Sequence, residues 1–152
     1  MAQRSVTTLP RILIVEDDLA IRGMLAAALG REGLVVDGAG DGLVALEMLA
    51  TATYAVIVVD LMMPRMDGFA FLDAFAKLSL PVRPLVFVMT AYDDAALLKL
   101  NGALVHGYLR KPFDLDQVVK IIRDAGQTLH GLQRTAPAAE TAPSADEARN
   151  AC

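Results

Sequence analysis

Five short, almost wholly apolar runs recur along the chain, and a stretch with the apolar spacing of a helix follows each of them. The runs cover residues 11–15, 34–37, 56–59, 85–89 and 107–110. A continuous apolar run is typical of a strand in a parallel sheet that is covered on both faces. Because crossovers between parallel strands are right-handed, the pattern predicts an α/β fold, a doubly wound five-stranded parallel sheet with five helices.

The helical stretches begin at or next to an aspartate, a residue that caps helices by accepting backbone N–H hydrogen bonds. These aspartates are Asp18, Asp41, Asp67, the pair Asp93 and Asp94, and Asp114. Gly33 is expected to end the first helix at about Arg31. Apolar residues at core spacing follow the caps, for example Leu43, Leu46 and Leu49 in the second helix and Leu115 to Leu129 in the last one.

Length and composition exclude several classes of protein. The chain has 152 residues, 55% of them hydrophobic, which is enough for the core of one domain. Its net charge of -4 argues against a nucleic-acid-binding surface. His106 and His130 are far apart and Cys152 is the one cysteine, which excludes an intrachain disulfide and a Cys/His zinc site.

The chain is expected to comprise a flexible N-terminus (1–10), a folded domain (11–130) and a disordered Ala/Pro-rich tail (131–152). The first ten residues lack the apolar core of a signal peptide. Glu47 and Asp60 interrupt the apolar stretch 43–63, which therefore indicates a helix and a strand and no membrane span. We expect a cytoplasmic protein with no membrane partner.

Polar side chains that could bind ligands or react lie just after the apolar runs, where ligands bind in an open α/β sheet. Glu16, Asp17 and Asp18 follow the first run, and Asp60 follows the third in the stretch YAVIVVDLMMPRMDGF. Thr90 follows the fourth and Lys111 the fifth, whereas residues 38–40, Gly-Ala-Gly, offer no chemical group. Close carboxylates repel each other by roughly 4 kcal/mol at an effective dielectric of 20, so the site requires cations. Lys111 is one, and oxygen ligands favour Mg²⁺ over zinc as the other.

Four motifs, ILIVEDD, VVDLMMPRMDG, VMTAY and YLRKPF, follow one another from Arg11 onwards. In order and spacing the chain resembles the receiver (CheY-like) domain of bacterial two-component response regulators, of the stand-alone single-domain type. The resemblance covers residues 11 to about 129. It implies a flavodoxin-like sheet of order 2-1-3-4-5, which makes Asp17 and Asp60 neighbours.

The resemblance also implies roles for individual residues. Asp60 corresponds to the phosphoacceptor, and Mg²⁺ would be held by Asp17, Asp60 and the backbone carbonyl of Met62, with Glu16 acting through water. Lys111 would pair with Asp60 and later with a phosphoryl oxygen. The phosphoryl group would also bind the Thr90 hydroxyl and the Ala91 backbone amide, and Tyr108 would move inward with Thr90. The Lys111–Pro112 peptide bond is expected to be cis.

A receiver of this kind would accept phosphate from the phosphohistidine of a histidine kinase or phosphotransfer protein. The face formed by the fourth helix, the fifth strand and the last helix would then bind a downstream protein, pass on phosphate or form a weak dimer. The chain would not be a turnover enzyme. Met62 and Tyr92 carry neither a carboxylate nor an amide to orient an attacking water, which predicts a long-lived phosphoryl group. Leu104 and Val105 stand where the family often has Gly-Ala, so the fourth helix is expected to be short or irregular.

Three other interpretations remain. The chain could be a receiver fragment of a larger hybrid kinase or regulator, or a pseudo-receiver that binds partners without phosphorylation. It could also be a Mg²⁺-dependent phosphatase with an aspartyl nucleophile. Such a phosphatase requires a second carboxylate two residues after the nucleophile, where this chain has Met62.

Overall fold

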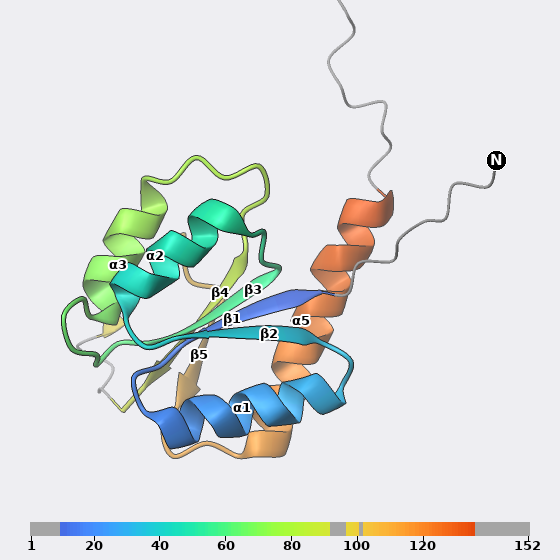
Figure 1. Cartoon of the computed structure of the whole chain (residues 1–152), viewed down its shortest axis with the longest axis horizontal. Coiled ribbons are helices and arrows are strands. Elements are labelled where there is room, and N and C mark those ends of the chain that lie inside the picture. Colours follow the sequence, from blue (N-terminus) through green and yellow to red (C-terminus); the bar gives the residue numbers. More distant parts are fainter. Residues whose placement is uncertain (1–9, 92–96, 101, 136–152) are drawn as a thin grey trace, which may run out of the picture.

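The computed structural model of the protein describes residues 10–91, 97–100 and 102–135, with residues 130–135 as backbone only. Nine helices and strands follow one another in these ranges (Figure 1). In chain order they are β1 (Arg11–Val15), α1 (Leu19–Arg31), β2 (Val35–Ala39), α2 (Gly42–Thr51), β3 (Val56–Asp60), α3 (Gly68–Ala76), β4 (Leu85–Thr90), β5 (Gly107–Arg110) and α5 (Leu115–Thr135). Residues 1–9, Tyr92, the expected helix start at Asp93 and Asp94, and Cys152 lie outside the described ranges.

The five strands form one parallel sheet of order β2-β1-β3-β4-β5, as predicted. Val15 is opposite Val59 in the pairing of β1 with β3, and Asp60 is opposite Met89 in the pairing of β3 with β4. Thr90 is opposite Arg110 in the last pair. The carboxyl ends of β1, β3, β4 and β5 therefore lie side by side at one edge of the sheet.

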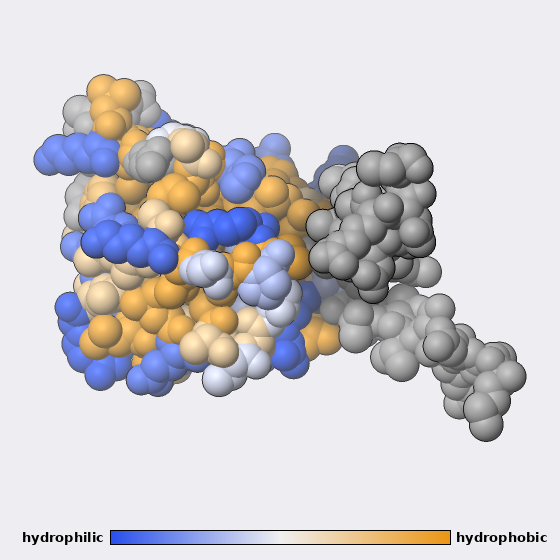
Figure 2. All heavy atoms as spheres, turned by 90° about the horizontal axis from the view of Figure 1, so that it is seen from above, coloured by the Kyte–Doolittle hydropathy of each residue, from blue (hydrophilic) through white to orange (hydrophobic). Residues whose placement is uncertain are grey.

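Helices cover the sheet on both faces, which confirms the doubly wound α/β class (Figure 1). Successive residues of β3 point to opposite faces, so Val56 and Val58 pack under α1 and α5, while Ile57 and Val59 pack under α2 and α3. All four side chains are fully buried. Figure 2 shows the molecule from the side of α2 and α3, where apolar side chains gather between hydrophilic ones.

Three of the predicted aspartates, Asp18, Asp41 and Asp67, cap helices. Asp18 accepts hydrogen bonds from the amides of Ala20 and Ile21 at 2.9 and 3.1 Å, and Asp67 accepts one from Ala70 at 2.8 Å. Asp41 accepts one from Val44 at 3.0 Å. Gly33 follows α1 with a φ of 79°, a left-handed conformation that glycine adopts without strain.

Several boundaries differ from the prediction. β2 covers Val35–Ala39 instead of 34–37, because its pairing with β1 continues to Ala39. β3 and β4 each extend by one residue and include Asp60 and Thr90. α5 continues to Thr135, past the expected domain boundary at residue 130.

The second helix buries the expected face in part: Leu49 is buried and Leu46 packs against the core, but Leu43 does not. Gly42, Ala45 and Leu49 of α2 are buried, whereas the side chain of Leu43 is 44% exposed. Between β4 and β5, the described residues include one helical position, Leu97, followed by a turn at Leu98 and Lys99. None of the helices in the described ranges combines the length and the apolar character needed to cross a bilayer.

Candidate phosphoacceptor site

The parallel sheet brings the polar residues predicted from the strand ends to one place. Glu16 directly follows β1, Asp60 ends β3, Thr90 ends β4 and Lys111 directly follows β5. The Lys111 backbone amide donates a hydrogen bond to the Thr90 carbonyl at 2.9 Å, which holds the ends of β4 and β5 together. Residues up to 95 positions apart in the sequence therefore meet at this edge.

Lys111 joins the two buried carboxylates of the site. Its Nζ donates hydrogen bonds to Oδ2 of Asp60 at 2.9 Å and to Oε2 of Glu16 at 3.0 Å. The side chains of Glu16 and Asp60 are 1% and 7% exposed, and that of Lys111 is 22% exposed. Oδ1 of Asp60 accepts a further hydrogen bond from the amide of Met62 at 3.0 Å. Asp60 is thus fixed at both carboxylate oxygens.

Burial and charge together set the protonation of this cluster. Burial lowers the pKa of the Lys111 ammonium, but the hydrogen bonds and charges of Asp60 and Glu16 outweigh it, so the pKa is raised overall. Burial raises the pKa of Glu16 to about 7, and the negative charge of Asp60 adds to this, against the hydrogen bonds from Lys111 and from the Asp18 amide. One ammonium group is therefore shared by carboxylates that carry more negative charge than it offsets.

The carboxylates of Glu16, Asp17 and Asp60 form a group that could hold a metal ion. Their oxygen atoms lie within 4.8 Å of one another, with Asp17 exposed and the other two buried. A hollow of about 360 Å³ opens beside them and is lined by Asp17, Leu61, Met62, Met63, Pro64 and Asp67. The donor set consists of oxygen atoms alone, which favours a hard cation such as Mg²⁺ over zinc.

Comparisons with known proteins agree with this geometry. The family model described as the response regulator receiver domain matches residues 12–123. The chain belongs to the response regulator receiver family. This membership is consistent with phosphorylation-dependent signalling, and the chain carries a cluster of acidic residues, Glu16, Asp17 and Asp60, consistent with Mg²⁺ and a phosphorylation site.

Two curated relatives illustrate the match. The receiver is 38% identical over 117 residues to the DNA-binding transcriptional regulator NtrC of Escherichia coli (strain K12), which covers 75% of this chain and 24% of NtrC. It is 34% identical over 118 residues to the sporulation initiation phosphotransferase F of Bacillus subtilis (strain 168), covering 76% of this chain and 89% of that protein. The receiver thus spans about a quarter of the length of NtrC but most of the length of the phosphotransferase.

Solved structures show the same fold. The chemotaxis protein CheY4 of Vibrio cholerae, crystallised at low pH, superposes with a TM-score of 0.71 and 28% identity over 78% of this chain and 99% of that one. The response regulator TrrA of Thermotoga maritima, in complex with Mg²⁺-BeF, superposes with a TM-score of 0.67 and 26% identity. That match covers 77% of this chain and 99% of the TrrA chain.

The remaining residues that the resemblance implied lie around the same edge. Thr90 is 1% exposed at the end of β4, and Ala91 follows it at the surface. Met62 lies in the β3–α3 loop with a side chain that is 58% exposed, and Tyr108 in β5 is 44% exposed. The Lys111–Pro112 bond is cis, as expected.

Arg22 is a further cation beside the acidic cluster of Glu16, Asp17 and Asp60, and no motif in the sequence pointed to it. Its Nη1 donates a hydrogen bond to the Glu16 carbonyl at 2.9 Å. Its side chain lies over β2 where Gly38 and Gly40 leave room, since a Cβ at Gly38 would be 2.8 Å from the Arg22 Cδ. The signal in the sequence is the Gly-Ala-Gly stretch, residues 38–40, which carries no chemical group of its own but leaves room for the Arg22 side chain.

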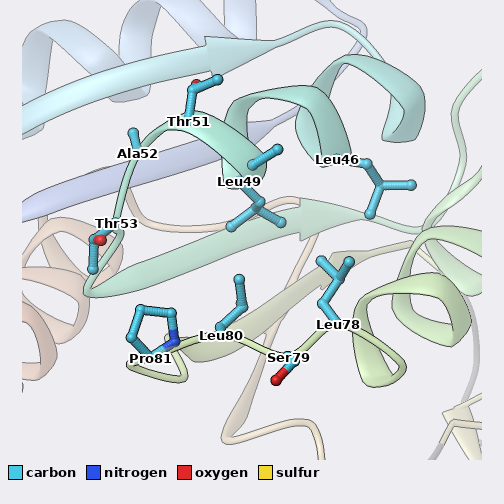
Figure 3. A pocket seen from close by; sticks show the side chains of 10 residues that line it. Leu46, Leu49, Thr51, Ala52, Thr53, Leu78, Ser79, Leu80 and Pro81 are labelled. Atoms are coloured by element: carbon cyan, nitrogen blue, oxygen red, sulfur yellow. The ribbon is translucent and has the colours of Figure 1, made fainter.

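A second hollow lies at the opposite edge of the sheet and takes no part in this site. It has a volume of about 410 Å³, and Leu46 and Leu49 of α2 face Leu78 and Leu80 of the α3–β4 connection across it (Figure 3). No titratable side chain lines it. It therefore offers apolar packing but no groups for acid–base or metal chemistry.

Proposed function

We propose that the protein is a signalling switch that accepts a phosphoryl group on Asp60 from a phosphohistidine of a histidine kinase or phosphotransfer protein. The observation that carries this proposal is the contact between Asp60 and Lys111 at 2.9 Å, beside the carboxylates of Glu16 and Asp17. A carboxylate that merely capped a helix would not require a partly buried ammonium partner. In this chain Asp67 performs the capping of α3.

In the proposed transfer, an oxygen of Asp60 attacks phosphorus as the nucleophile. The new O–P bond forms as the N–P bond of the phosphohistidine breaks, and the imidazole nitrogen leaves with the electron pair and takes up a proton. Lys111 holds Asp60 in place before the reaction and then neutralises a phosphoryl oxygen. The amide of Ala91 and the hydroxyl of Thr90 are the expected donors to the other oxygens.

Asp17, Asp60 and the backbone carbonyl of Met62 would hold Mg²⁺, with Glu16 contributing through water. When bound, Mg²⁺ would neutralise the negative charge that gathers on the phosphoryl oxygens. The similar structure of TrrA was solved in complex with Mg²⁺-BeF, which supports this assignment. The carboxylate oxygens of Glu16, Asp17 and Asp60, which suit a hard cation, support it as well.

Phosphorylation would act as a switch through Thr90 and Tyr108. A phosphoryl group adds nearly two negative charges at Asp60 and new acceptor oxygens. Thr90 would shift toward these oxygens, and Tyr108, now half exposed on β5, would follow inward. The surface around β5 and α5 would change its affinity for a downstream protein or for a second copy, as in a population shift between two states.

We further propose that the protein is not a turnover enzyme and that Met62 leaves the phosphoryl group long-lived. The Met62 side chain stands exposed beside the site and offers no oxygen or amide to orient an attacking water. A phosphoryl group that is lost within seconds in Mg²⁺ buffer would refute the second statement.

Incubation with Mg²⁺ and acetyl phosphate or beryllofluoride tests the proposal, with intact mass and amide NMR spectra as readouts. We expect one adduct per chain, absent in Asp60→Asn, with chemical shift changes at Thr90 and Tyr108. Sustained release of phosphate would indicate a phosphatase. Spectra that do not respond to Mg²⁺ and beryllofluoride would indicate a pseudo-receiver and overturn the proposal.

A further inference from the structure

The loop between β3 and α3 has a strained turn next to the acidic cluster. The Met66 amide donates a hydrogen bond to the Pro64 carbonyl at 2.7 Å, two residues back, and the residue between them, Arg65, has a φ of 63°. A γ-turn with a positive central φ is rare and strained. Among the described residues, Arg65 is the one position other than glycine with a positive φ. Such a conformation persists when its surroundings hold it in place.

An ion pair holds this turn to the start of α2. Nη2 of Arg65 donates a hydrogen bond to Oδ2 of Asp41, the N-cap residue of α2. The Asp41 side chain is 4% exposed, whereas that of Arg65 is 64% exposed and reaches inward from the surface. The hydrogen bond from the Val44 amide is the main cause that lowers the pKa of Asp41 below its usual range. The Arg65 guanidinium also lowers this pKa, whereas burial opposes the shift. Asp41 is therefore a fixed anion at neutral pH.

Backbone contacts fix the same loop at two further points. The Gly42 amide donates a hydrogen bond to the Met66 carbonyl at 3.3 Å, and a Cβ on Gly42 would be 2.7 Å from the Met66 Cγ. The Gly68 amide donates to the Leu61 carbonyl at 3.1 Å. The loop therefore rests directly on the first residue of α2 at one side and on the end of β3 at the other.

We propose that Arg65 and Asp41 are positioning residues that hold the β3–α3 loop in the shape required for Mg²⁺ binding. Neither residue touches the acidic cluster, but the loop they hold contains Met62 and Pro64, which line the hollow beside Asp17. Metal affinity depends on the groups that orient the ligands as well as on the ligands themselves. The inference rests on the proposed function, since it names residues that prepare the proposed metal site.

A role of Arg65 and Asp41 in holding the loop can be distinguished from a direct effect of their charges on Mg²⁺ binding. If the exposed Arg65 acted only by repelling a cation, its removal would tighten Mg²⁺ binding, and removal of the Asp41 charge would weaken it. If the pair holds the loop, removal of either partner weakens binding. The two variants therefore move in the same direction under the proposal and in opposite directions under plain electrostatics.

The test uses Arg65→Gly, Asp41→Asn and their double variant. Glycine adopts a positive φ without strain, so Arg65→Gly removes the guanidinium and leaves the turn sterically possible. Asparagine caps helices as well as aspartate does, so Asp41→Asn removes the charge and keeps the cap of α2. Arg65→Lys tests rescue by another cation. Glu32→Gln is the matched control, because it removes the acid of another arginine ion pair, Glu32 with Arg123 at 3.1 Å, far from the site.

Two measurements read out the effect on the full chain. Calorimetric titration with Mg²⁺ alone gives the affinity, and we expect both single variants to bind about tenfold more weakly than the wild type. The double variant should be no weaker than the weaker single variant, Arg65→Lys should recover most of the affinity, and Glu32→Gln should match the wild type. In metal-free protein, the Gly42 amide should exchange its hydrogen faster in Arg65→Gly and Asp41→Asn.

Wild-type affinity in Arg65→Gly and Asp41→Asn, or tighter binding in Arg65→Gly, would overturn the inference and leave the proposed function standing. A wild-type chain that fails to bind Mg²⁺ would overturn both. Unchanged exchange at Gly42 in the metal-free variants would also contradict the holding role, because that amide contacts the Met66 carbonyl directly.

Discussion

The ammonium nitrogen of Lys111 lies 2.9 Å from Oδ2 of Asp60, although the two residues are 51 positions apart in the chain. The same nitrogen lies 3.0 Å from Oε2 of Glu16. One cation therefore pairs with two buried carboxylates and does not neutralise both. Burial raises the pKa of one of them, Glu16, to about 7. In the metal-free site, folding therefore disfavours the ionised form of Glu16 relative to the unfolded chain.

This imbalance predicts a pH-dependent cost in stability. Glu16 has an ordinary pKa of 4.5 in the unfolded chain and about 7 in the folded one. Its contribution to folding is therefore fully present below pH 4.5 and is lost as the pH rises through 7. Glu16→Gln cannot ionise, so the variant should gain stability relative to the wild type over that window, on the order of 1–2 kcal/mol.

Urea unfolding at a series of pH values, with a chelator present, measures this difference. Added Mg²⁺ should reverse it, because the wild type gains a cation that the glutamine variant binds less well. A stability difference between the two proteins that stays constant from pH 4.5 to 8 would show that folding does not raise the pKa of Glu16.

Two adjacent aspartates provide a matched test of the metal site. Asp17 lies in the acidic cluster, whereas Asp18 caps α1 through the amides of Ala20 and Ile21. Asp17→Asn should weaken Mg²⁺ binding at least tenfold, since a carboxylate ligand becomes a neutral amide. Asp18→Asn should keep both the cap and most of the affinity. Calorimetric titration of both variants decides the point, and equal losses would contradict the assignment of Asp17.

The sequence predicted those features that depend on chain order, and it missed those that depend on side-chain contacts between elements. Parallel pairing brings the carboxyl ends of all strands to one edge, so the sequence alone could place Glu16, Asp60, Thr90 and Lys111 there, and the resemblance supplied the strand order. The contacts of Arg22 could not be predicted in this way, because they depend on how α1 packs against the carboxyl end of β2.

Local patterns were ambiguous for a different reason. Leu43 has the hydrophobicity of a core residue, but α2 turns its Gly42–Ala45–Leu49 stripe inward and leaves Leu43 at the surface. The strained turn at Arg65 had no signal in residue type, because glycine or asparagine would be the usual residue at a positive φ. An ion pair with a residue 24 positions away accompanies that conformation.

The contact of Arg22 with β2 predicts coupling between Arg22 and Gly38. A methyl group at Gly38 would lie 2.8 Å from the Arg22 Cδ, so Gly38→Ala should push the arginine away from the Glu16 carbonyl. The expected loss is about 1 kcal/mol from the displaced hydrogen bond and contact. In an Arg22→Ala background the same glycine substitution should be close to neutral, because the obstacle is gone. Urea unfolding of the four proteins gives the coupling, and equal effects in both backgrounds would contradict it.

Two glycines should respond to alanine in opposite directions. A Cβ on Gly68, the first residue of α3, would lie 2.5 Å from the Asp60 carbonyl oxygen and 2.7 Å from the Leu61 Cα. These are backbone atoms at the end of β3 and cannot move aside as a flexible side chain can, so Gly68→Ala should cost about 2–3 kcal/mol of stability. Because the clash is at Asp60 itself, the variant should also weaken Mg²⁺ binding.

Gly23 in α1 has open space around it, so Gly23→Ala should stabilise the protein by about 0.5–1 kcal/mol without affecting the site. Thermal and urea unfolding together with Mg²⁺ titration check both variants, and a well-tolerated Gly68→Ala would mean that α3 can move away from the end of β3.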